Sequence, residues 1–509
     1  MTQAPDAATL NLSLVAHTNV GKTSLMRTLM RRDIGEVADR PHVTERAEGH
    51  ALLETAEGDV LRLWDTPGFG DSVRLLKRLR MSGNPIGWLI TQVWDRFADR
   101  PFFSSQQAIL NVRNESDVVL YLVNAAEDPT SAAYVEAELE ILVWIGKPVL
   151  LLLNQMGPAR AREAEAAEEA AWSTHLAAFV PARESIGLDA FARCWVQEDR
   201  LLAAVGALLP EAKQPALQRL RETWRSQNLE VFDASIKAIA SQLTAAATDR
   251  EALKESGGVS GLARKAARWF ASLASESEKP DPVTEHGMNA LAKRLDQQVR
   301  ENTDQLIALH GLSGRAKKEI PARMAGAFDV TTPADVGTTG VLGGMLTGAL
   351  GGLVADLSAG GLTFGAGALI GGIVGALGGA GAAKAYNLVT GIEGGTVRWS
   401  PNFLSHRPAA ALLRYLAVAH YGRGRGDWVE GEYPSHWAAV VHSVVQQYQG
   451  EFDAAWRLAE QDATAAQLNA QLEPALRAAA RDTLVRLYPQ AARIFDNDIA
   501  ERAAAKRAG

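Results

Sequence analysis

The sequence has almost no cysteine and no excess of basic residues. Its single cysteine, Cys194, excludes an internal disulfide and is typical of a reducing compartment. Apolar residues surround Cys194, so we expect a buried structural thiol. The 52 Lys and Arg residues are outnumbered by 59 Asp and Glu residues, which leaves a formal net charge of -7. Nucleic acid is therefore not expected as the main partner, because phosphate contacts require concentrated positive charge.

The N-terminus lacks the pattern of a secretory signal. Met1–Thr9 is polar and has no basic start followed by an apolar core. We therefore expect the N-terminal domain to lie in the cytoplasm. The 509 residues are enough for about two to four domains with hydrophobic cores.

A glycine- and lysine-containing loop follows the first apolar run. Residues 16–24 match the phosphate-binding loop (P-loop) pattern G-x-x-x-x-G-K-S/T, except that Ala16 replaces the first glycine. In this pattern backbone N–H groups and a helix N-terminus surround phosphates. Gly21 allows close backbone approach, Lys22 supplies positive charge to the outer phosphates, and Thr23 offers a hydroxyl to magnesium.

A second motif, Asp-Thr-Pro-Gly, closes the apolar strand predicted over Val60–Trp64. Asp65 can hold magnesium, in part through water, because this ion keeps several water ligands and takes few carboxylates. Gly68 can direct its N–H toward a terminal phosphate. The two motifs together predict a site for a nucleotide with its magnesium ion.

Five strand-like runs alternate with helical stretches in this part of the chain. That alternation predicts an α/β doubly wound sheet with the ligand at the strand ends. The runs are Leu10–Val15, Ala51–Glu54, Val60–Trp64, Val118–Val123 and Val149–Leu153.

The two motifs resemble those of the translation-factor class of small GTPases, in particular its Era-like and septin-like branch. This resemblance covers residues 1–200 and implies GTP and GDP as ligands, Mg²⁺ as cofactor, and GTP hydrolysis that is slow or activated by dimerisation. The whole chain resembles a bacterial family that joins an Era-like GTPase domain to a C-terminal region of unknown function.

The resemblance also assigns roles to residues outside the two motifs. Thr44 takes the place of the first switch threonine, which completes the magnesium shell. Asn154 and Gln155 occupy the place of the guanine motif Asn-Lys-x-Asp, whereas Gly157 cannot supply its carboxylate. Ala182 takes the place of the N–H donor in the last base-contacting loop. The nucleotide contacts expected are Asn19, Val20, Gly21, Lys22, Thr23, Ser24, Thr44, Asp65, Gly68, Asn154, Gln155 and Ala182; the magnesium ligands are Thr23, Thr44 and Asp65; the catalytic residues are Lys22, Asn19 and Gly68.

The glutamine that orients water in many of these enzymes is absent. Phe69 follows Gly68, and a phenyl ring can neither donate nor accept the required hydrogen bond. Asn19 matches an asparagine that helps to hold potassium in potassium-stimulated members of the branch. We therefore hypothesise potassium-dependent turnover stimulated by dimerisation; alternatively, Asn19 only braces the loop.

Residues 71–116 carry many leucine and aromatic side chains at helical spacing. Such spacing favours core packing, and the alternative is a surface that contacts a second protomer or a membrane. After residue 200 the strand pattern disappears, and we expect α-helical domains over 201–335 and 386–509. Within the second of these, Pro474 predicts the start of a helix that continues to Tyr488.

The stretch 336–385 between them is rich in glycine and contains two apolar runs, separated at Asp356. The length of each run is close to that of a helix that spans a bilayer, which needs about 20 residues. Glycines recur every fourth residue in both runs, as in closely packed membrane helices. The pattern favours a transmembrane helical hairpin with a glycine zipper; a buried helix pair and a flexible linker are the alternatives. The recurring glycines are Gly340, Gly344, Gly348 and Gly352, and Gly367, Gly371, Gly375 and Gly379.

These features predict a membrane-associated GTPase on the cytoplasmic face of the bacterial inner membrane. Its nucleotide state would control membrane insertion, assembly or partner binding. The expected partners are membrane lipid and a second copy of the chain, as a homodimer or higher oligomer through the GTPase domain. The alternatives are a soluble regulatory switch with a packed hairpin and a nucleotide-triggered pore-forming effector.

Overall fold

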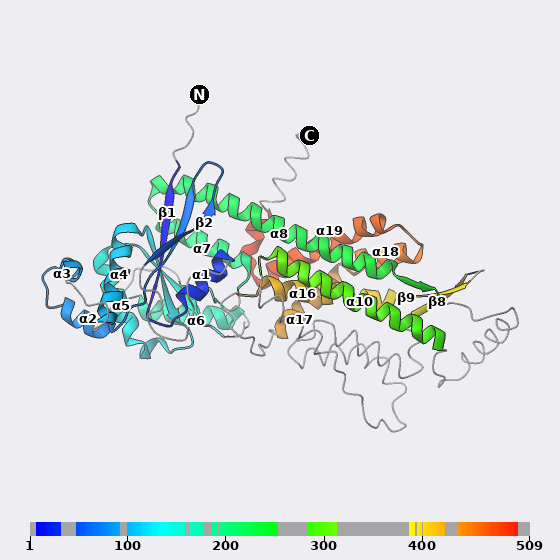
Figure 1. Ribbon diagram of the computed structural model, residues 1–509, viewed down its shortest axis with the longest axis horizontal. Coiled ribbons are helices and arrows are strands. Elements are labelled where there is room, and N and C mark those ends of the chain that lie inside the picture. Colours follow the sequence, from blue (N-terminus) through cyan, green and yellow to red (C-terminus); the bar gives the residue numbers. More distant parts are fainter. Residues whose placement is uncertain are drawn as a thin grey trace, which may run out of the picture. The chain divides into compact units, whose positions relative to one another are not determined.

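The computed structural model divides the chain into two compact units (Figure 1). Unit 1 comprises the described residues up to Glu230 together with 419–422 and 488–496, and unit 2 comprises those of 231–418 and 435–487. The structure describes residues 7–31, 47–91, 99–157, 160, 162–177, 185–190, 193–252, 282–312, 386–391, 394–399, 401–422 and 435–496. Thr44, Ala182 and the glycine-rich stretch 336–385 lie outside these residues.

A six-stranded sheet forms the centre of unit 1. Its strand order is β2-β3-β1-β4-β5-β6; β2 is antiparallel to β3, and the other neighbours are parallel. The strands are β1 (Thr9–Ala16), β2 (Glu48–Glu54), β3 (Val60–Asp65), β4 (Val118–Asn124), β5 (Val149–Asn154) and β6 (Ser185–Gly187). The α/β sheet expected from the sequence is thus confirmed, and β6 is a strand that the sequence pattern did not predict.

Strands β4 and β5 are apolar up to the asparagine at the end of each. Every residue of β5 is buried, and in β4 all but Asn124 are buried. The helices of this part are α1 (Lys22–Met30), α2 (Ser72–Leu79), α3 (Pro85–Thr91), α4 (Arg100–Glu115), α5 (Ala133–Ile145), α6 (Arg162–Leu176) and α7 (Trp195–Leu208). Parallel strands buried on both faces lose the polar and apolar alternation of a half-exposed sheet.

The apolar stretch 71–116 supplies core residues, in agreement with the favoured interpretation. Leu75, Leu76 and Leu79 of α2 and Leu89 of α3 are buried in one hydrophobic cluster with residues of β4 and α5. Cys194 is also fully buried, and burial raises the pKa of its thiol to about 12. Cys194 is therefore a structural thiol, as expected.

Unit 2 is mainly helical, as expected for the region after residue 200. The boundary between the units falls within α8 (Gln214–Thr248), and the further helices are α10 (Pro282–Leu309), the short α15 (Pro401–Ser405), α16 (Arg407–Ala419), α17 (Ser435–Gln447), α18 (Gln449–Glu460) and α19 (Ala465–Leu487). Pro474 lies inside α19, so the prediction that it starts a helix is wrong. The helix already begins at Ala465, nine residues earlier in the chain.

Unit 2 also contains a small antiparallel sheet that the sequence pattern did not predict. Strands β7 (Arg250–Ala252), β9 (Gly394–Trp399) and β8 (Tyr386–Gly391) lie side by side in that order. The three residues of β7 are too few for a periodic signal, and their partner lies far along the chain. No helix within the described ranges is both long and apolar enough to cross a membrane.

Candidate nucleotide site

The loop between β1 and α1 has the conformation that its glycine and asparagine allow. Asn19 has φ 66° and Gly21 has φ 93°, both in the left-handed region that asparagine and glycine tolerate best. A Cβ on Gly21 would lie 2.8 Å from Nδ2 of Asn154. Glycine is therefore required at position 21, and the conformation of Asn19 agrees with a bracing role in the loop.

Lys22 is the first residue of α1, and only 7% of its surface is exposed. Its Nζ donates to the carbonyl oxygen of His17 at 3.5 Å. Burial lowers the pKa of Lys22, whereas the negative charges of Asp65 and Glu138 oppose that shift. A phosphate bound in the loop would add a counter-charge close to this partly desolvated ammonium group.

Thr23 and Asp65 meet at the carboxyl end of the sheet. The hydroxyl of Thr23 donates to Oδ2 of Asp65 at 2.6 Å, and Asp65 is 5% exposed. A hydroxyl and a carboxylate are the hard oxygen ligands that magnesium prefers, so the two residues fit this ion. Within the described ranges no group of three or more His, Cys, Asp and Glu residues could hold a metal.

Asn154, the last residue of β5, connects three segments of the site. Its Nδ2 donates to the carbonyl of Val20 at 2.7 Å, and its Oδ1 accepts from the backbone N–H of Ala190 at 2.8 Å. The neighbouring Gln155 donates from Nε2 to the carbonyl of Asn19 at 3.4 Å. The first two positions of the expected guanine motif therefore lie against the phosphate-binding loop.

The loop that follows β6 reaches the same place. Because β6 is parallel to β5, with Leu153 opposite Gly187, both strands end at one edge of the sheet. Asp189 accepts from the backbone N–H of Met156 through Oδ2 at 2.8 Å, and is 5% exposed. Asp189 and Ala190 are site residues that sequence reasoning missed, because it assigned the last base-contacting loop to residues around Ala182. The signal available was a short apolar segment followed by an aspartate.

The segment after Asp65 is attached to the phosphate-binding loop through its backbone. The N–H of Phe69 donates to the carbonyl of Ala16 at 2.9 Å, and the N–H of Thr18 donates to the carbonyl of Phe69 at 3.2 Å. A Cβ on Gly68 would lie 2.9 Å from Thr18 Cγ2 and 3.0 Å from Lys22 Nζ, so only glycine fits this close approach. Gly68 thus lies beside Lys22, while the ring of Phe69 is fully buried.

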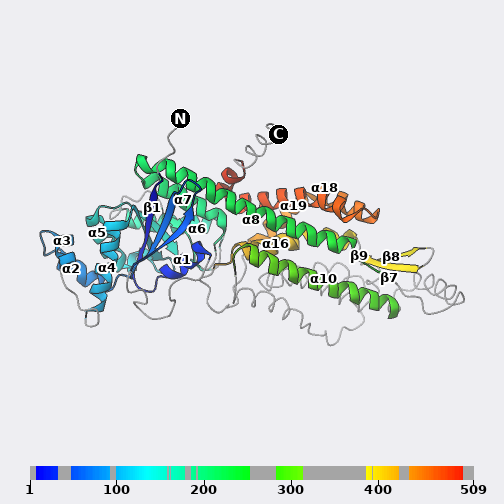
Figure 2. The same cartoon turned by 45° about the horizontal axis from the view of Figure 1, so that its top comes forward.

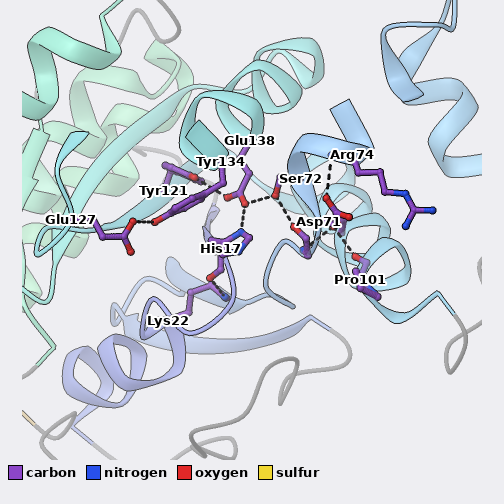
Figure 3. A network of polar contacts seen from close by, with 12 residues as sticks. His17, Lys22, Asp71, Ser72, Arg74, Pro101, Tyr121, Glu127, Tyr134 and Glu138 are labelled. Atoms are coloured by element: carbon purple, nitrogen blue, oxygen red, sulfur yellow. Dashed lines mark hydrogen bonds and ion pairs between the residues drawn. The ribbon is translucent and has the colours of Figure 1, made fainter. Parts of the chain in front are cut away.

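A buried carboxylate, Glu138 of α5, connects the loop to α2 (Figure 3). It accepts hydrogen bonds from the hydroxyls of Ser72 and Tyr121, and Nδ1 of His17 lies 2.7 Å from its Oε1. Burial and the negative charge of Glu138 raise the pKa of Tyr121. Glu138 was not predicted from the sequence, although an acidic residue in helical register with the apolar Val135 and Leu142 was a usable signal.

Two family models match the chain. One, described as 50S ribosome-binding GTPase (MMR_HSR1), matches residues 11–155, and the other, a domain of unknown function (DUF3482), matches residues 182–487. No curated protein matches the chain.

Several solved structures are similar to the chain at low sequence identity. An Aquifex aeolicus Era variant bound to GDP.AlF4- is 16% identical over 40% of this chain and 57% of its own, with a TM-score of 0.29. NFeoB from S. thermophilus, bound to mGMPPNP, is 14% identical over 45% of this chain and 70% of its own, with a TM-score of 0.21. One member of an oligomerised bacterial dynamin pair is 10% identical over 99% of this chain and 73% of its own, with a TM-score of 0.26. The chain spans less than two thirds of the length of the Era structures.

Proposed function

The chain belongs to the DUF3482 family and carries a P-loop GTPase domain, and we propose that it is a membrane-associated enzyme that binds and hydrolyses GTP with magnesium. The observation that carries this proposal is the arrangement at the carboxyl ends of β1 and β3. There Lys22 and Thr23 of the phosphate-binding loop lie next to two residues of the second motif. Thr23 contacts Asp65, and Gly68 lies beside Lys22. Each of these groups has a defined task in phosphoryl transfer.

Phosphate binding is assigned to the loop. Its backbone N–H groups and the N-terminus of α1 attract the phosphate oxygens, and Lys22 neutralises the outer phosphates. Magnesium, when bound by Thr23 and Asp65, would offset the negative charge that develops on the phosphate oxygens. The N–H of Gly68 senses the terminal phosphate. Thr44 is proposed to complete the magnesium shell; it lies outside the described residues.

The proposed base is guanine, in line with the Era-like and septin-like sequence motifs. Asn154 and Gln155 support this choice through their contacts with the loop. Gly157 has no carboxylate to pair with guanine, so the preference for GTP over ATP is expected to be weaker than in proteins with the full motif. Ala182 remains the proposed N–H donor to the base, and it too lies outside the described residues.

Catalysis needs a group other than the residue after Gly68. The buried ring of Phe69 cannot orient water. We propose that Asn19 helps to hold a potassium ion beside the phosphates and that dimerisation through the GTPase domain completes this site. The test compares GTP hydrolysis by wild type and Asn19→Ala in potassium and in sodium. A wild-type rate at least about tenfold higher in potassium, lost in the variant, supports the proposal. Equal rates in all four conditions exclude it.

Membrane association is assigned to residues 336–385. The support is the recurrence of glycine at every fourth position in two long apolar runs, which suits helices packed in lipid. The proposed location is the cytoplasmic face of the inner membrane, with lipid and further copies of the chain as partners. Nucleotide state would then control insertion or assembly.

One experiment tests enzyme and membrane coupling together. Phosphate release from GTP is measured for the full-length protein in potassium buffer, with and without liposomes, beside a variant that lacks residues 336–385. Hydrolysis stimulated by liposomes only when the stretch is present supports the whole proposal. Hydrolysis independent of lipid would instead favour a soluble switch. No hydrolysis above that of Lys22→Ala would contradict enzymatic function.

A further inference from the structure

Helix α16 carries two arginines that are buried inside unit 2. Arg407 and Arg414 are 4% and 1% exposed, and they are seven positions apart, about two helical turns, so both lie on one face. Figure 2 shows α16 close to α8 and α10. Gln242 of α8 and Asn302 of α10 contact Arg414 directly.

The partners of these two arginines are neutral. Nη2 of Arg414 donates to Oδ1 of Asn302 at 2.8 Å and to Oε1 of Gln242 at 3.3 Å. The guanidinium of Arg407 lies over the ring of Phe403, with 5.6 Å between Cζ and the ring centroid. In the part of the chain that the structure describes, neither guanidinium pairs with a carboxylate, whereas arginines elsewhere in unit 2 do.

Those other arginines provide the internal comparison. Arg477 pairs with Asp233 at 2.8 Å and Arg294 pairs with Asp249 at 2.9 Å. Both are more exposed than Arg407 and Arg414. Arg407 and Arg414, which are the more buried and so the more in need of a counter-charge, therefore have no carboxylate partner among the described residues.

In the described part of the chain, the unsatisfied side-chain atoms of Arg407, Arg414 and of the two amides that contact Arg414 are donors, whereas Gln298 and Asp304 of α10 each leave a buried acceptor unsatisfied. Five buried N–H groups in this cluster find no acceptor among the described residues: Nε and Nη1 of Arg414, Nε of Arg407, Nδ2 of Asn302 and Nε2 of Gln242. A buried donor without an acceptor is costly, and a buried charge without a counter-ion is more so. A bound anion would supply acceptors to donors of this kind and a counter-charge to the two arginines.

The electrostatics of the pair point the same way. Burial lowers the pKa of Arg407 to about 10, and burial together with the nearby charge of Arg407 lowers the pKa of Arg414 to about 9. Both values lie above neutral pH, so both groups carry a positive charge there. Two like charges in the interior repel each other unless an anion lies near them.

We propose that unit 2 contains a buried site for a small phosphate-class oxyanion, held by Arg407 and Arg414 and completed by the amides of Asn302 and Gln242. Guanidinium groups bind phosphate oxygens through paired N–H donors, and a tetrahedral oxyanion offers enough acceptors for several donors at once. The burial of both arginines favours a free anion over a lipid headgroup. This site is separate from the nucleotide site, and the proposal does not depend on GTP hydrolysis.

The test is equilibrium dialysis of labelled inorganic phosphate against the full-length protein, saturated with GDP and magnesium to occupy the phosphate-binding loop. The variants are Arg414→Met and Arg481→Met, the latter a control for an arginine of unit 2 that pairs with Asp482 at the surface. Wild type and Arg481→Met are expected to bind one phosphate per chain. Arg414→Met is expected to bind at least about tenfold more weakly.

Two outcomes would overturn the proposal. One is the absence of phosphate binding by wild type, and the other is equal binding by wild type and Arg414→Met. Repeating the dialysis in Lys22→Ala checks that the loop does not contribute the signal. Flotation with phosphatidylglycerol vesicles, and with phosphatidylcholine vesicles as control, separates the two sources of phosphate. If wild type binds inorganic phosphate and floats with the vesicles to the same extent as Arg414→Met, the ligand is a free anion. If wild type binds no inorganic phosphate and only the variant loses flotation, the proposal of a free anion is overturned and the site belongs to a lipid headgroup.

Discussion

Asn154 and Asn124 end neighbouring strands in the same register but have different surroundings. Asn124 pairs directly with Asn154 across β4 and β5. The side chain of Asn154 hydrogen-bonds to Val20 in the loop and to Ala190 after β6, whereas among the described residues that of Asn124 hydrogen-bonds to Glu127 and Ala126. The pair therefore offers a matched test of the role that one asparagine has in nucleotide binding.

We expect Asn154→Ala to weaken GDP binding by about 10- to 100-fold, because the loss of two buried hydrogen bonds costs about 1–3 kcal/mol. Asn124→Ala should change the dissociation constant by less than about threefold, since this side chain has no contact with the loop. Titration with a fluorescent GDP analogue measures both. Equal dissociation constants for the two variants would show that the bridge to Val20 does not shape the site.

Glu138 is the second residue whose surroundings suggest a sharp test. We expect Glu138→Gln to lower the free energy of unfolding by about 2 kcal/mol, because the new amide N–H₂ would face the donors of Ser72 and Tyr121. Glu140 of the same helix pairs with the exposed Arg80, and exposed ion pairs contribute little to stability. Glu140→Gln should therefore lower the free energy of unfolding much less than Glu138→Gln. Urea denaturation compares the two, and a smaller loss in Glu138→Gln than in Glu140→Gln would contradict the network.

At the scale of elements, an ion pair attaches the start of α8 to the turn between β2 and β3. Arg219 donates from Nε to Oδ2 of Asp59 at 2.6 Å and from Nη2 to Oδ1 at 2.9 Å. Thr55 and the backbone N–H of Ala8 also donate to this buried carboxylate. The hydrogen bonds from Arg219 are the main cause that lowers the pKa of Asp59.

The sign of the resulting pH dependence follows from that lowered pKa. Asp59 binds a proton more readily when unfolded, so its contribution to stability is present above about pH 4 and lost as the pH falls through the folded-state pKa. We expect Arg219→Met to be less stable than wild type at neutral pH. As the pH is lowered from 5 through the folded-state pKa of Asp59, the variant should lose less stability than wild type. Arg221→Met, which breaks a more exposed pair with Asp199, should keep the wild-type slope. Urea midpoints across pH measure the slopes, and parallel curves for Arg219→Met and wild type would refute this account.

The regular elements of unit 1 were the most predictable part of the fold. Apolar runs marked β4 and β5, because strands covered on both faces need apolar side chains throughout. In β1 and β3 the apolar residues alternate with Asn11, Ser13 and Arg62 and still marked the strands. β6 and β7 have three residues each and carry no periodic signal of their own. Each exists because a longer strand, β5 or β9, offers it backbone hydrogen bonds.

At the scale of the whole molecule, the two units should respond differently to nucleotide. The proposed site lies entirely within unit 1, so ligand binding stabilises that unit directly. With free GDP at 100 times its dissociation constant and magnesium present, the gain is about 2.7 kcal/mol. We expect calorimetry to show an upward shift of the transition assigned to unit 1 in wild type and none in Lys22→Ala. A shift of equal size in the variant would place the bound GDP elsewhere.

The sequence by itself determined the parts of this protein that are local in the chain. The loop from Ala16 to Ser24 and the Asp-Thr-Pro-Gly motif can be read from the sequence, because each motif needs only a strand end and the few residues after it, and the structure brings Thr23 of one into contact with Asp65 of the other. The missing carboxylate at Gly157 and the replacement by Phe69 were equally plain. For these features residue identity limits the chemistry before any folding is considered.

Only the tertiary structure decided which distant residues complete the sites. Glu138 meets His17 across 121 positions, Asn154 meets Val20 across 134, and Arg414 meets Gln242 across 172. No spacing in the sequence reports such pairs, since they depend on which elements the topology makes neighbours. Burial then determines their energetic weight, because a charge or donor removed from water must find its partner inside the protein.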